Sequence, residues 1–307
     1  MRKDKDSVNV QITFLGTSNA IPTAERNHPA IWLEWNAERI LIDCGEGTQR
    51  QIKKADLNPC KLTKILLTHL HGDHVLGLPG LLETLEMSEY ARQLDIYGPK
   101  GTARHLELLQ QTYGKFNIQI KVHELPCNIE TDDWKIEAAP MDHGIPAWAF
   151  AFIIKERRRL DKAKIKRLKL PNTPLLGEIQ KGKDVVINGK KVKAKDLVYV
   201  QPSTKVAIIM DTKFNQNAIE IAKDADLVVC ESTYAEKEKE YAENYRHLTA
   251  SQAATIAKRA KAKSLILTHI AQRYEQNLKF IENEAKKIFK NVRVAKDLER
   301  KEIRLND

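Results

Sequence analysis

The sequence predicts an α/β fold in which two similar halves meet at one site. Short apolar runs typical of buried strands alternate along the chain with longer segments typical of helices. A five-residue pattern also occurs twice, as I-L-L-T-H at 65–69 and as L-I-L-T-H at 265–269. Both copies end in threonine and histidine after three apolar residues. We therefore expect two related half-domains whose strands end at a common place.

The first half of the chain shows the alternation clearly. Val8–Gly16 alternates apolar and polar residues, as a half-buried strand does. The other strands expected in this half are at 31–33, 39–42, 65–67, 94–97 and 116–122, and its helices are expected at 48–55, 76–88 and 102–112.

The second half repeats this organisation. Its expected strands are at 134–138, 148–154, 206–210, 227–230 and 265–268, and its expected helices are at 214–223, 250–260 and 274–289. Thr249 stands directly before one of these helices, so we expect it to be the N-cap.

A cluster of imidazoles and one carboxylate follows the strand at 65–67. His69, His71, Asp73 and His74 lie within six residues, in a chain with nine histidines. A solvated polar loop is the alternative, but H-x-H-x-D-H is typical of a metal site. His69 and His71 suit one ion, and Asp73 and His74 point to a neighbouring ion. Since zinc takes about four ligands per ion, we expect further ligands from other parts of the chain.

Other expected strands end in residues that can bind metals. His143 follows the strand at 134–138, Asp211 follows the strand at 206–210, and His269 ends the second copy of the repeated pattern. A lone histidine is usually structural, so His143 is only a candidate on local grounds, whereas the repeat predicts that His269 is a ligand. Asp43 either orients a metal-bound histidine or caps the helix at 48–55, and the sequence leaves both open.

Positive charge is concentrated in one segment. Residues 155–195 contain fifteen Lys or Arg and four Asp or Glu, a net charge of +11, whereas the rest of the chain carries 36 basic and 37 acidic residues. A charge run is usually a solvated face, but a basic arm on a neutral body suggests a grip on a polyanion. The segment has almost no aromatic residues, so phosphate contact is the expected mode. Pro171, Pro174 and Gly177 suggest a bend in a protruding, hairpin-like arm.

Composition favours a soluble cytoplasmic protein. No apolar run reaches the length needed to span a membrane, and no targeting segment is evident. The four cysteines, Cys44, Cys60, Cys127 and Cys230, lack metal-type spacing, so reduced thiols are expected.

The motifs resemble those of the metallo-β-lactamase superfamily. The matching segments are T-H-L-H-G-D-H at 68–74, D-H-G-I-P at 142–146, M-D-T at 210–212 and L-T-H-I-A-Q-R-Y at 267–274. Within that superfamily, P-T-A-E-R-N at 22–27, the basic arm, and Glu231 with His247 resemble the ribonuclease Z family of tRNA 3′-end endonucleases. The resemblance covers residues 14–274. It implies a four-layer αββα sandwich as one domain over 1–307, with the arm at 155–195 inserted for tRNA binding.

The resemblance also implies a site with two zinc ions per protomer. His69, His71 and His143 would hold one ion, Asp73, His74 and His269 would hold the other, and Asp211 would bridge them. Asp73 would accept a proton, and Glu231 with His247 would protonate the departing oxygen. The alternatives are that Glu231 caps the following helix and that His247 is a surface residue. Family members are usually homodimers, with one protomer's arm clamping precursor tRNA whose 3′ end enters the other's site.

Contacts to RNA are expected from the loop at 22–27 and from the arm. The candidate residues are Arg26, Asn27, Arg157, Arg158, Arg159, Lys166, Arg167 and Lys169. Arg26 and Asn27 have the alternative of closing a loop. His28, His105 and His123 have no evident partner in the sequence and are expected to be structural.

The chain departs from the family pattern at four places. Ala24 replaces the lysine of P-x-K-x-R-N, and Cys230 replaces the histidine of His-Glu-Ala-Thr. Leu248 replaces the serine of His-Ser-Thr, and the Gly-Pro-rich tip of the arm is reduced to P-N-T-P-L-L-G at 171–177. None of these changes removes a ligand.

The expected function is zinc-dependent cleavage of the 3′ trailer from precursor tRNA. The products would be tRNA with a 3′-OH and a trailer with a 5′-phosphate. A phosphodiesterase or thioesterase of the same superfamily acting on small substrates is the alternative. It would explain the metal ligands but not the charge of the arm.

Overall fold

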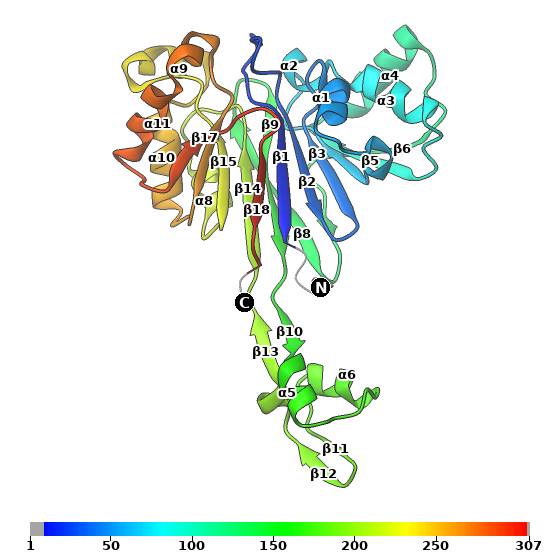
Figure 1. The fold of residues 1–307 in the computed structure, drawn as a ribbon. Coiled ribbons are helices and arrows are strands. Elements are labelled where there is room, and N and C mark those ends of the chain that lie inside the picture. The colour runs from blue at the N-terminus through cyan, green and yellow to red at the C-terminus, as the bar shows by residue number, and fades with distance from the viewer. Residues whose placement is uncertain (1–8, 306–307) are drawn as a thin grey trace.

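Two seven-stranded sheets pack face to face in the computed structural model, which describes residues 9–305 (Figure 1). The first sheet has the order β18-β1-β2-β3-β4-β5-β6. Its strands are β1 Val10–Gly16, β2 Ala30–Trp35, β3 Glu38–Ile42, β4 Lys64–Leu66, β5 Gln93–Gly98, β6 Gln119–Glu124 and β18 Arg300–Ile303. Val8, predicted to begin the first strand, and the outer limits of the predicted domain lie outside the described residues.

The second sheet has the order β17-β16-β15-β14-β9-β8-β7. Its strands are β7 Ile129–Glu130, β8 Trp134–Asp142, β9 Pro146–Ile154, β14 Thr204–Ile209, β15 Leu227–Glu231, β16 Leu265–Thr268 and β17 Val292–Val294. Strands β14 to β17 are parallel, and β8 and β9 form an antiparallel pair beside them. The parallel strands are covered on both faces, which explains why they read as continuous apolar runs.

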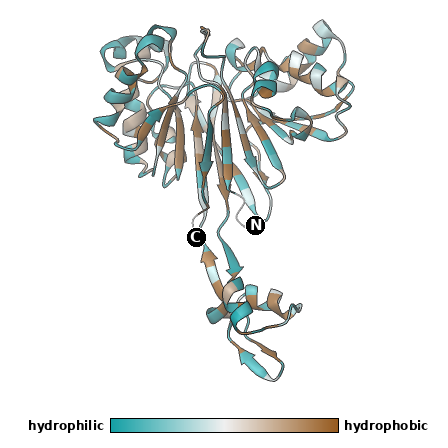
Figure 2. Ribbon diagram, viewed as in Figure 1, coloured by the Kyte–Doolittle hydropathy of each residue, from teal (hydrophilic) through white to brown (hydrophobic). Residues whose placement is uncertain are grey.

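Helices cover the outer face of each sheet (Figure 1). On the first sheet they are α1 Thr48–Lys54, α3 Leu78–Met87 and α4 Thr102–Tyr113, and on the second they are α8 Gln216–Ala222, α10 Ala250–Arg259 and α11 Leu278–Lys286. Val206 and Ile208 of β14 face the core between the sheets, whereas Ala207 and Ile209 face the helices. This alternation gives the four-layer αββα sandwich, so the predicted fold class is confirmed. Figure 2 shows the hydrophobic residues concentrated on the strands.

The remaining sandwich elements are short. They are α2 Gly72–Val75, α9 Lys239–Tyr245, and the 3-10 helices η1 Pro59–Lys61, η2 Glu236–Glu238 and η3 Gln272–Asn277. Thr249 caps α10 as predicted, since its hydroxyl accepts the Gln252 N–H and the Gln252 side chain accepts the Thr249 N–H. All four cysteines are free, with Cys44 and Cys230 buried.

Two predicted helices differ from the structure. The helix expected at 76–88 is α3, which begins only at Leu78; the short helix α2 at 72–75 precedes it, and Leu76 and Gly77 lie between the two. A Cβ at Gly77 would lie 2.0 Å from the carbonyl oxygen of Gly45, so the chain passes closely over the end of β3 there. The helix expected at 274–289 starts as η3 and becomes α-helical only in α11.

The arm, predicted at 155–195, spans residues 157–201 in the structure and leaves the sandwich between β9 and β14 (Figure 1). The strands β10 Arg157–Leu160 and β13 Val198–Gln201 pair as a stalk. The head contains α5 Lys162–Arg167, α6 Leu175–Gln180, β11 Val185–Ile187, β12 Lys190–Val192 and α7 Ala194–Leu197. Its own small core includes Ile179 and Leu197, both fully buried. The arm is therefore more than the predicted hairpin, because three short helices fill its head and its stalk continues to Gln201.

The arm and the first cluster of predicted ligands lie at opposite ends of the sandwich (Figure 1). The arm follows Ile154 at one end of β9, and the other end of β9, Pro146, lies three residues after His143. Since β9 has nine residues, the two ends are separated by roughly 25–30 Å at about 3.3 Å per residue. Within residues 9–305, no helix is both long and apolar enough to cross a membrane.

Candidate metal centre

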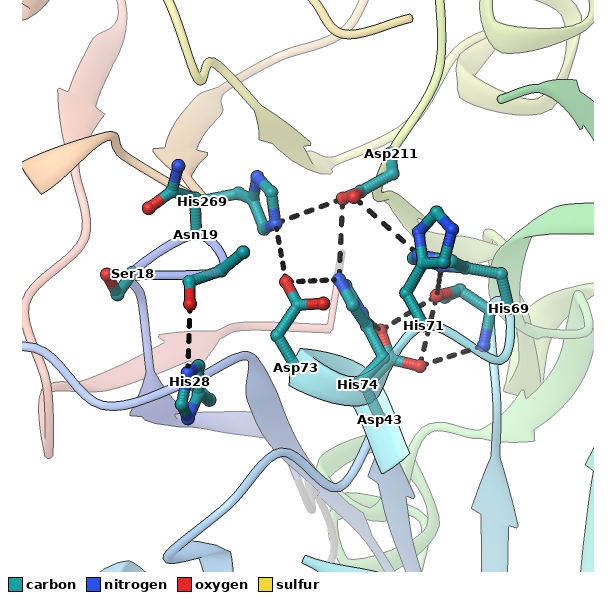
Figure 3. Close-up of polar contacts among 12 residues, drawn as sticks. Ser18, Asn19, His28, Asp43, His69, His71, Asp73, His74, Asp211 and His269 are labelled. Atoms are coloured by element: carbon teal, nitrogen blue, oxygen red, sulfur yellow. Dashed lines mark hydrogen bonds and ion pairs between the residues drawn. The ribbon is translucent and has the colours of Figure 1, made fainter. Parts of the chain in front are cut away.

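The seven predicted metal ligands meet at one edge of the sandwich, where strands from both sheets end. Figure 3 shows this cluster, with all of these residues labelled except His143. Each ligand-bearing segment follows the carboxyl end of a strand. His69, His71, Asp73 and His74 follow β4, His143 follows β8, Asp211 follows β14 and His269 follows β16. The same edge in a parallel sheet collects the loops that carry side chains for chemistry.

One group of ligands consists of His69, His71, His143 and one oxygen of Asp211. Oδ2 of Asp211 lies 3.6 Å from Nε2 of His69 and 3.5 Å from Nε2 of His143. Nδ1 of His71 lies 3.1 Å from Nε2 of His143. His71 is exposed whereas the other three residues are buried, so this group opens toward solvent on the His71 side.

The second group uses the other oxygen of the same aspartate. Oδ1 of Asp211 lies 3.2 Å from Nε2 of His269 and 3.5 Å from Nε2 of His74. Oδ2 of Asp73 lies 3.6 Å and 3.4 Å from these two nitrogens. Asp211 therefore stands between the groups and presents one oxygen to each (Figure 3).

These atoms fit two divalent cations. Nε2 of His69, His74 and His269 and Oδ1 of Asp211 are buried and have no hydrogen-bond partner in the described part of the chain. Leaving a buried polar atom unpaired costs about 1–3 kcal/mol, so four such atoms facing one another need a common partner. Nitrogen and carboxylate oxygen donors in sets of about four suit zinc and other first-row metals.

The outward-facing nitrogens of the histidines are held by the protein. Nδ1 of His74 lies 2.7 Å from Asp43, Nδ1 of His69 lies 3.0 Å from Thr68, and Nδ1 of His143 lies 2.9 Å from the carbonyl oxygen of Arg246. Because carboxylate and carbonyl oxygens only accept, Asp43 and Arg246 keep the proton of His74 and His143 on Nδ1. Nε2 of His74 and Nε2 of His143 then face the site, where each can bind a metal ion, as in many metal centres.

His269 is held through a longer hydrogen-bonded chain. Its Nδ1 lies 2.8 Å from the hydroxyl of Thr233, which donates to Oε2 of Glu231 at 2.6 Å. Since Thr233 gives its proton to Glu231, it must accept the proton of His269. His269 also has a positive φ of 57°, a conformation that non-glycine residues seldom adopt and that is often found at functional sites.

The structure decides between the two alternatives for Asp43. Its carboxylate accepts the Thr68 N–H at 2.8 Å as well as the Nδ1–H of His74. Helix α1 instead begins after Gly47 and has no side-chain cap. Asp43 therefore orients a candidate metal-binding histidine, and the helix-cap alternative is wrong.

Glu231, which is buried, pairs with half-buried His247 beside Asp211. Nδ1 of His247 lies 3.1 Å from Oε1 of Glu231 and 3.8 Å from Oδ2 of Asp211. Glu231, His247 and His269 are also close enough to hold an ion together. However, Glu231 already accepts the Thr212 N–H at 2.8 Å and the Thr233 hydroxyl, so its geometry favours a proton-transfer pair over a third metal site. Glu231 caps no helix, because the next helical element, η2, begins after Ala235 and α9 begins after Glu238.

The electrostatics of the site favour bound positive charge. Burial lowers the pKa of His247, but Glu231 and Asp211 outweigh burial and raise that pKa to about 9. Burial also opposes a charge on His74, yet Asp43 and Asp211 raise its pKa well above the usual value. Asp211 also favours a charge on His69, but burial together with His74 outweighs it and lowers the pKa of His69 well below the usual value.

The two residues of the 22–27 loop that were predicted to contact RNA, Arg26 and Asn27, differ in their contacts. Arg26 is 3% exposed, with its guanidinium bound to Glu275 at 3.1 Å, the Thr17 hydroxyl at 2.6 Å and the Ala295 carbonyl at 2.9 Å. These contacts close the loop, so the structure favours that alternative and argues against an RNA contact by Arg26. Asn27 donates to the Glu46 carbonyl at 2.7 Å and lines a cavity of about 510 Å³.

The predicted arm residues also divide into two kinds. Nε of Arg157 and of Arg159 donates to Oε1 of Gln201 at 3.1 and 3.0 Å, which ties the stalk together. Arg158 is exposed and donates to the Lys181 carbonyl at 2.6 Å. The remaining three candidates, Lys166, Arg167 and Lys169, are exposed at the end of α5.

Several contributors were missed by the sequence reasoning. Thr68 and Thr233 orient histidines through their hydroxyls, and Arg246 does so through its backbone carbonyl. A Cβ at Gly45 would lie 2.3 Å from the carbonyl oxygen of Asp73, so only glycine lets β3 approach the ligand loop. The repeated T-H pair could have predicted the role of Thr68, whose hydroxyl contacts the next histidine. It could not have predicted Thr233, because the hydroxyl that contacts His269 is not that of Thr268.

His28, His105 and His123 were expected to be structural. His28 lies 3.3 Å from the Ala20 carbonyl in the loop after β1, and His123 pairs with Asp95 at 2.8 Å. Burial lowers the pKa of His105. None of the three belongs to the groups of possible metal ligands among the described residues.

Two packed sheets with a two-group His/Asp cluster at their shared edge define a metallo-β-lactamase-fold protein with a candidate binuclear centre. A family model described as Anti-Pycsar protein Apyc1 matches residues 10–146, which include His69 to His143 but not Asp211 or His269. The metallo-β-lactamase fold protein YhfI from Bacillus subtilis, 18% identical, has the same fold, with a TM-score of 0.71 over 96% of this chain and 100% of the other.

Relatives at higher identity show the family. Ribonuclease Z of Protochlamydia amoebophila is 40% identical over 94% of this chain and 94% of its own length, and that of Methanosarcina acetivorans is 35% identical over 96% and 98%. The crystal structure of the short form of human tRNase Z is 26% identical, with a TM-score of 0.68 over 95% of this chain and 98% of the other. This chain belongs to the ribonuclease Z family. It is accordingly a phosphodiester hydrolase.

Proposed function

We propose that this chain is an endoribonuclease that removes the 3′ trailer from precursor tRNA, leaving tRNA with a 3′-OH and a trailer with a 5′-phosphate. The observation that carries the proposal is the pair of buried Glu231 and half-buried His247, whose imidazole lies 3.8 Å from Asp211. A leaving alkoxide needs a proton, and this imidazole is placed to give one. The near-full-length similarity to ribonuclease Z proteins supports RNA as the substrate.

We assign two zinc ions to the two ligand groups. His69, His71 and His143 would hold one ion, and Asp73, His74 and His269 the other, with Asp211 shared between them. When bound, two such ions neutralise phosphate charge and lower the pKa of water. The protein supplies the fixed geometry, because the nitrogens of His69, His74, His143 and His269 that face away from the site are each anchored.

Two residues would move protons in this reaction. Asp73, with its carboxylate at the edge of the second group, would accept or orient the proton of the attacking water. His247 would donate a proton to the leaving 3′-oxygen. Glu231 holds Nδ1 of His247 at 3.1 Å, which leaves Nε2 to deliver that proton.

The arm would grip the body of the tRNA. Residues 155–195 carry a net charge of +11, and Lys166, Arg167 and Lys169 are exposed on the head. Because the arm and the site lie at opposite ends of the sandwich, we propose that the enzyme is a homodimer in which each arm serves the site of the other protomer (Figure 1). The proposed substrate is an intracellular RNA, which agrees with the expected cytoplasmic location.

The test of the activity is cleavage of a 3′-extended precursor tRNA with mapping of the product ends. We expect one cut at the end of the acceptor stem, lost after chelation and in Asp73→Ala. Elemental analysis of the same protein should give two zinc ions per chain. Zinc binding without RNA cleavage, together with turnover of a small phosphodiester or thioester, would contradict the proposal and favour the small-substrate alternative.

The dimer proposal has its own test. Ile154 and Thr204 are paired neighbours, so replacing residues 156–202 by Asn-Gly closes a short hairpin and removes the arm. We expect this variant and Asp73→Ala each to be inactive on precursor tRNA. If arms act across the dimer, mixed dimers of the two variants regain activity, because one protomer supplies a site and the other an arm. Mixed dimers without activity would show that each arm serves its own site.

A further inference from the structure

A row of aromatic rings leads from the candidate centre to the surface. The ring of His247 lies 5.0 Å from that of His143 and 6.1 Å from that of Tyr234, measured between centroids. Tyr234 is followed by Tyr241 at 6.5 Å and Tyr241 by Tyr245 at 6.3 Å, with interplanar angles of 24° and 1°. We call Tyr234, Tyr241 and Tyr245 the tyrosine row.

The outer members of the row are exposed. Tyr234 is 8% exposed, but Tyr241 is 53% and Tyr245 61% exposed. Large aromatic rings are worth most when covered, and their flat faces accept other aromatic groups. Two parallel, exposed rings beside a reaction centre thus form a platform for a planar ligand.

The helix that carries two residues of the tyrosine row is hydrogen-bonded to the backbone of His247. Tyr241 and Tyr245 occupy positions i and i+4 of α9, and the N–H of His247 donates to the carbonyl of Ala242 in that helix at 2.8 Å. The position of the rings is therefore fixed relative to His247. The guanidinium of Arg273 lies 5.7 Å from the ring centroid of Tyr234 and supports the inner end of the row.

Charge separates this surface from the arm. Residues 236–246 hold four acidic and three basic residues, a net charge of −1, whereas residues 155–195 hold +11. A surface without excess positive charge is a poor grip on phosphates, but base stacking needs no such charge. The arm has the charges and almost no aromatic residues, and the tyrosine row has the opposite composition.

We propose that the tyrosine row stacks the bases of unpaired nucleotides next to the scissile phosphate. This inference rests on the proposed function, because the occupant is the single-stranded end of the precursor tRNA. The inner member of the row, Tyr234, lies 6.1 Å from the ring of His247, the proposed donor to the leaving 3′-oxygen, so a nucleotide held there lies near the bond that is cut. Stacking would position the strand, and the ligand groups would act on the phosphate.

The alternative is that Tyr241 and Tyr245 only support α9. Pairs of aromatic and apolar side chains at i and i+4 do stabilise helices by small amounts. That role would change the melting temperature without changing KM. The two roles can therefore be separated by measuring both quantities on the same variants.

The experiment compares Tyr241→Ala/Tyr245→Ala with the wild-type chain on precursor tRNA. We expect KM to rise about tenfold with kcat nearly unchanged, since stacking of one base contributes binding of that order. Tyr241→Phe/Tyr245→Phe should restore KM, because the ring and not the hydroxyl makes the contact. Tyr113→Ala is the matched control, since Tyr113 is 57% exposed on α4 in the other half of the molecule.

A second part of the experiment uses precursor tRNA substrates with one abasic nucleotide, placed either 5′ or 3′ of the cut. At the stacked position, the abasic substrate should have the same KM with wild-type and double-alanine enzyme, and this identifies the side that is bound. An equal KM penalty on intact and on both abasic substrates would overturn the inference, as would an unchanged KM on intact substrate. A changed oligomeric state in light scattering would instead make the row a contact between protomers and also overturn it.

Failure of the proposed function has a different signature. If the wild-type chain does not cleave precursor tRNA, both the function and the stacking inference fall. If it cleaves and the double-alanine variant behaves like the wild type, only the stacking inference falls.

Discussion

The two ends of the sandwich are built on different principles. At the site end, Asp211 is 4% exposed and His69 and His74 are fully buried, and their contacts come from strands far apart in the sequence. At the other end, the arm folds around its own small core and keeps Lys166, Arg167 and Lys169 in solvent. The site thus depends on distances of a few tenths of an ångström, whereas the arm depends on the amount and sign of its charge.

This difference predicts how each end responds to substitution. Removing one atom from the site leaves its buried partners unpaired, which is costly and not compensated by neighbours. Removing one charge from the arm leaves many similar charges in place, and water replaces the lost contact. Substitutions should therefore have large and individual effects at the site, and small and additive ones at the arm.

Asp211→Ala tests the site end most severely. Because Asp211 presents one oxygen to each ligand group, we expect loss of both ions and a fall in kcat of more than about 10³-fold. Metal content and cleavage rate measure this directly. Asp133→Ala at the arm end is the matched control and should keep both, and a normally metallated, active Asp211→Ala would contradict the assignment of Asp211.

His247→Ala should come next in size. Loss of a general acid typically reduces the rate by about 10²–10⁴-fold, and we expect the lower part of that range in kcat at saturating precursor tRNA. Glu231→Gln keeps the shape of its partner but removes the carboxylate that holds Nδ1. It should lower kcat less than His247→Ala does, and metal content should stay the same in both. An unchanged kcat in His247→Ala would remove His247 from the mechanism.

Asp43→Asn tests whether orientation of a ligand matters as much as the ligand. Its amide nitrogen would be a donor facing Thr68 and His74, where the structure has an acceptor. Loss of a hydrogen bond that orients a metal ligand typically costs about 10–100-fold in metal affinity or activity. Zinc titration against a chelator measures the effect. Equal zinc affinity in variant and wild type would show that His74 needs no carboxylate.

The arm should give a smaller, salt-dependent effect. Neutralising Lys166, Arg167 and Lys169 with glutamine should weaken tRNA binding about tenfold near physiological salt and reduce the salt slope by about one per lost contact. The charge-matched control replaces Lys286, Lys287 and Lys290 of the exposed face near α11. If both triple variants lose the same affinity for tRNA, the arm does not bind tRNA more strongly than other basic surfaces of the protein.

The smallest expected effect concerns Asp297, which joins the loop after β1 to α1. Burial raises the pKa of Asp297 to about 6, even though Thr17 and the Asn27 N–H donate to its carboxylate. The folded state therefore binds this proton more tightly than the unfolded state, so the contribution is present below pH 4 and is lost as pH rises through 6. It amounts to about 1–3 kcal/mol in the free energy of unfolding. The free energy of unfolding, measured with denaturant between pH 4 and 7, should differ between wild type and Asp297→Asn by an amount that changes with pH. Parallel plots of the two free energies against pH would contradict this role of Asp297.

The repeated T-H pattern shows how far local sequence reaches. It correctly placed His69 and His269 at the ends of β4 and β16, one in each sheet. However, Thr68 anchors His69 directly, whereas His269 is anchored by Thr233 from the end of β15. The pattern encodes the strand end, but which hydroxyl meets the imidazole depends on the neighbouring strand.

The loop at 22–27 and the arm show the opposite case. Arginine was expected to contact RNA at position 26, and its charge is instead used by Glu275 from a segment about 250 residues away. Arg157 and Arg159 are held by Gln201 in the same way. Composition predicted the total charge of these regions, but it could not tell which guanidinium groups are paired with other side chains of the protein.

The sequence by itself determined the α/β architecture, the strand ends, the identity of the candidate ligands and the location of the excess charge. These follow from apolar periodicity and from residue chemistry, which act over a few neighbouring positions. Only the tertiary structure decided that Asp211 faces both ligand groups, that Asp43 orients His74, and that the arm points away from the site. Such outcomes depend on how strands from two sheets are packed, and packing brings together residues whose separation along the chain carries no local signal.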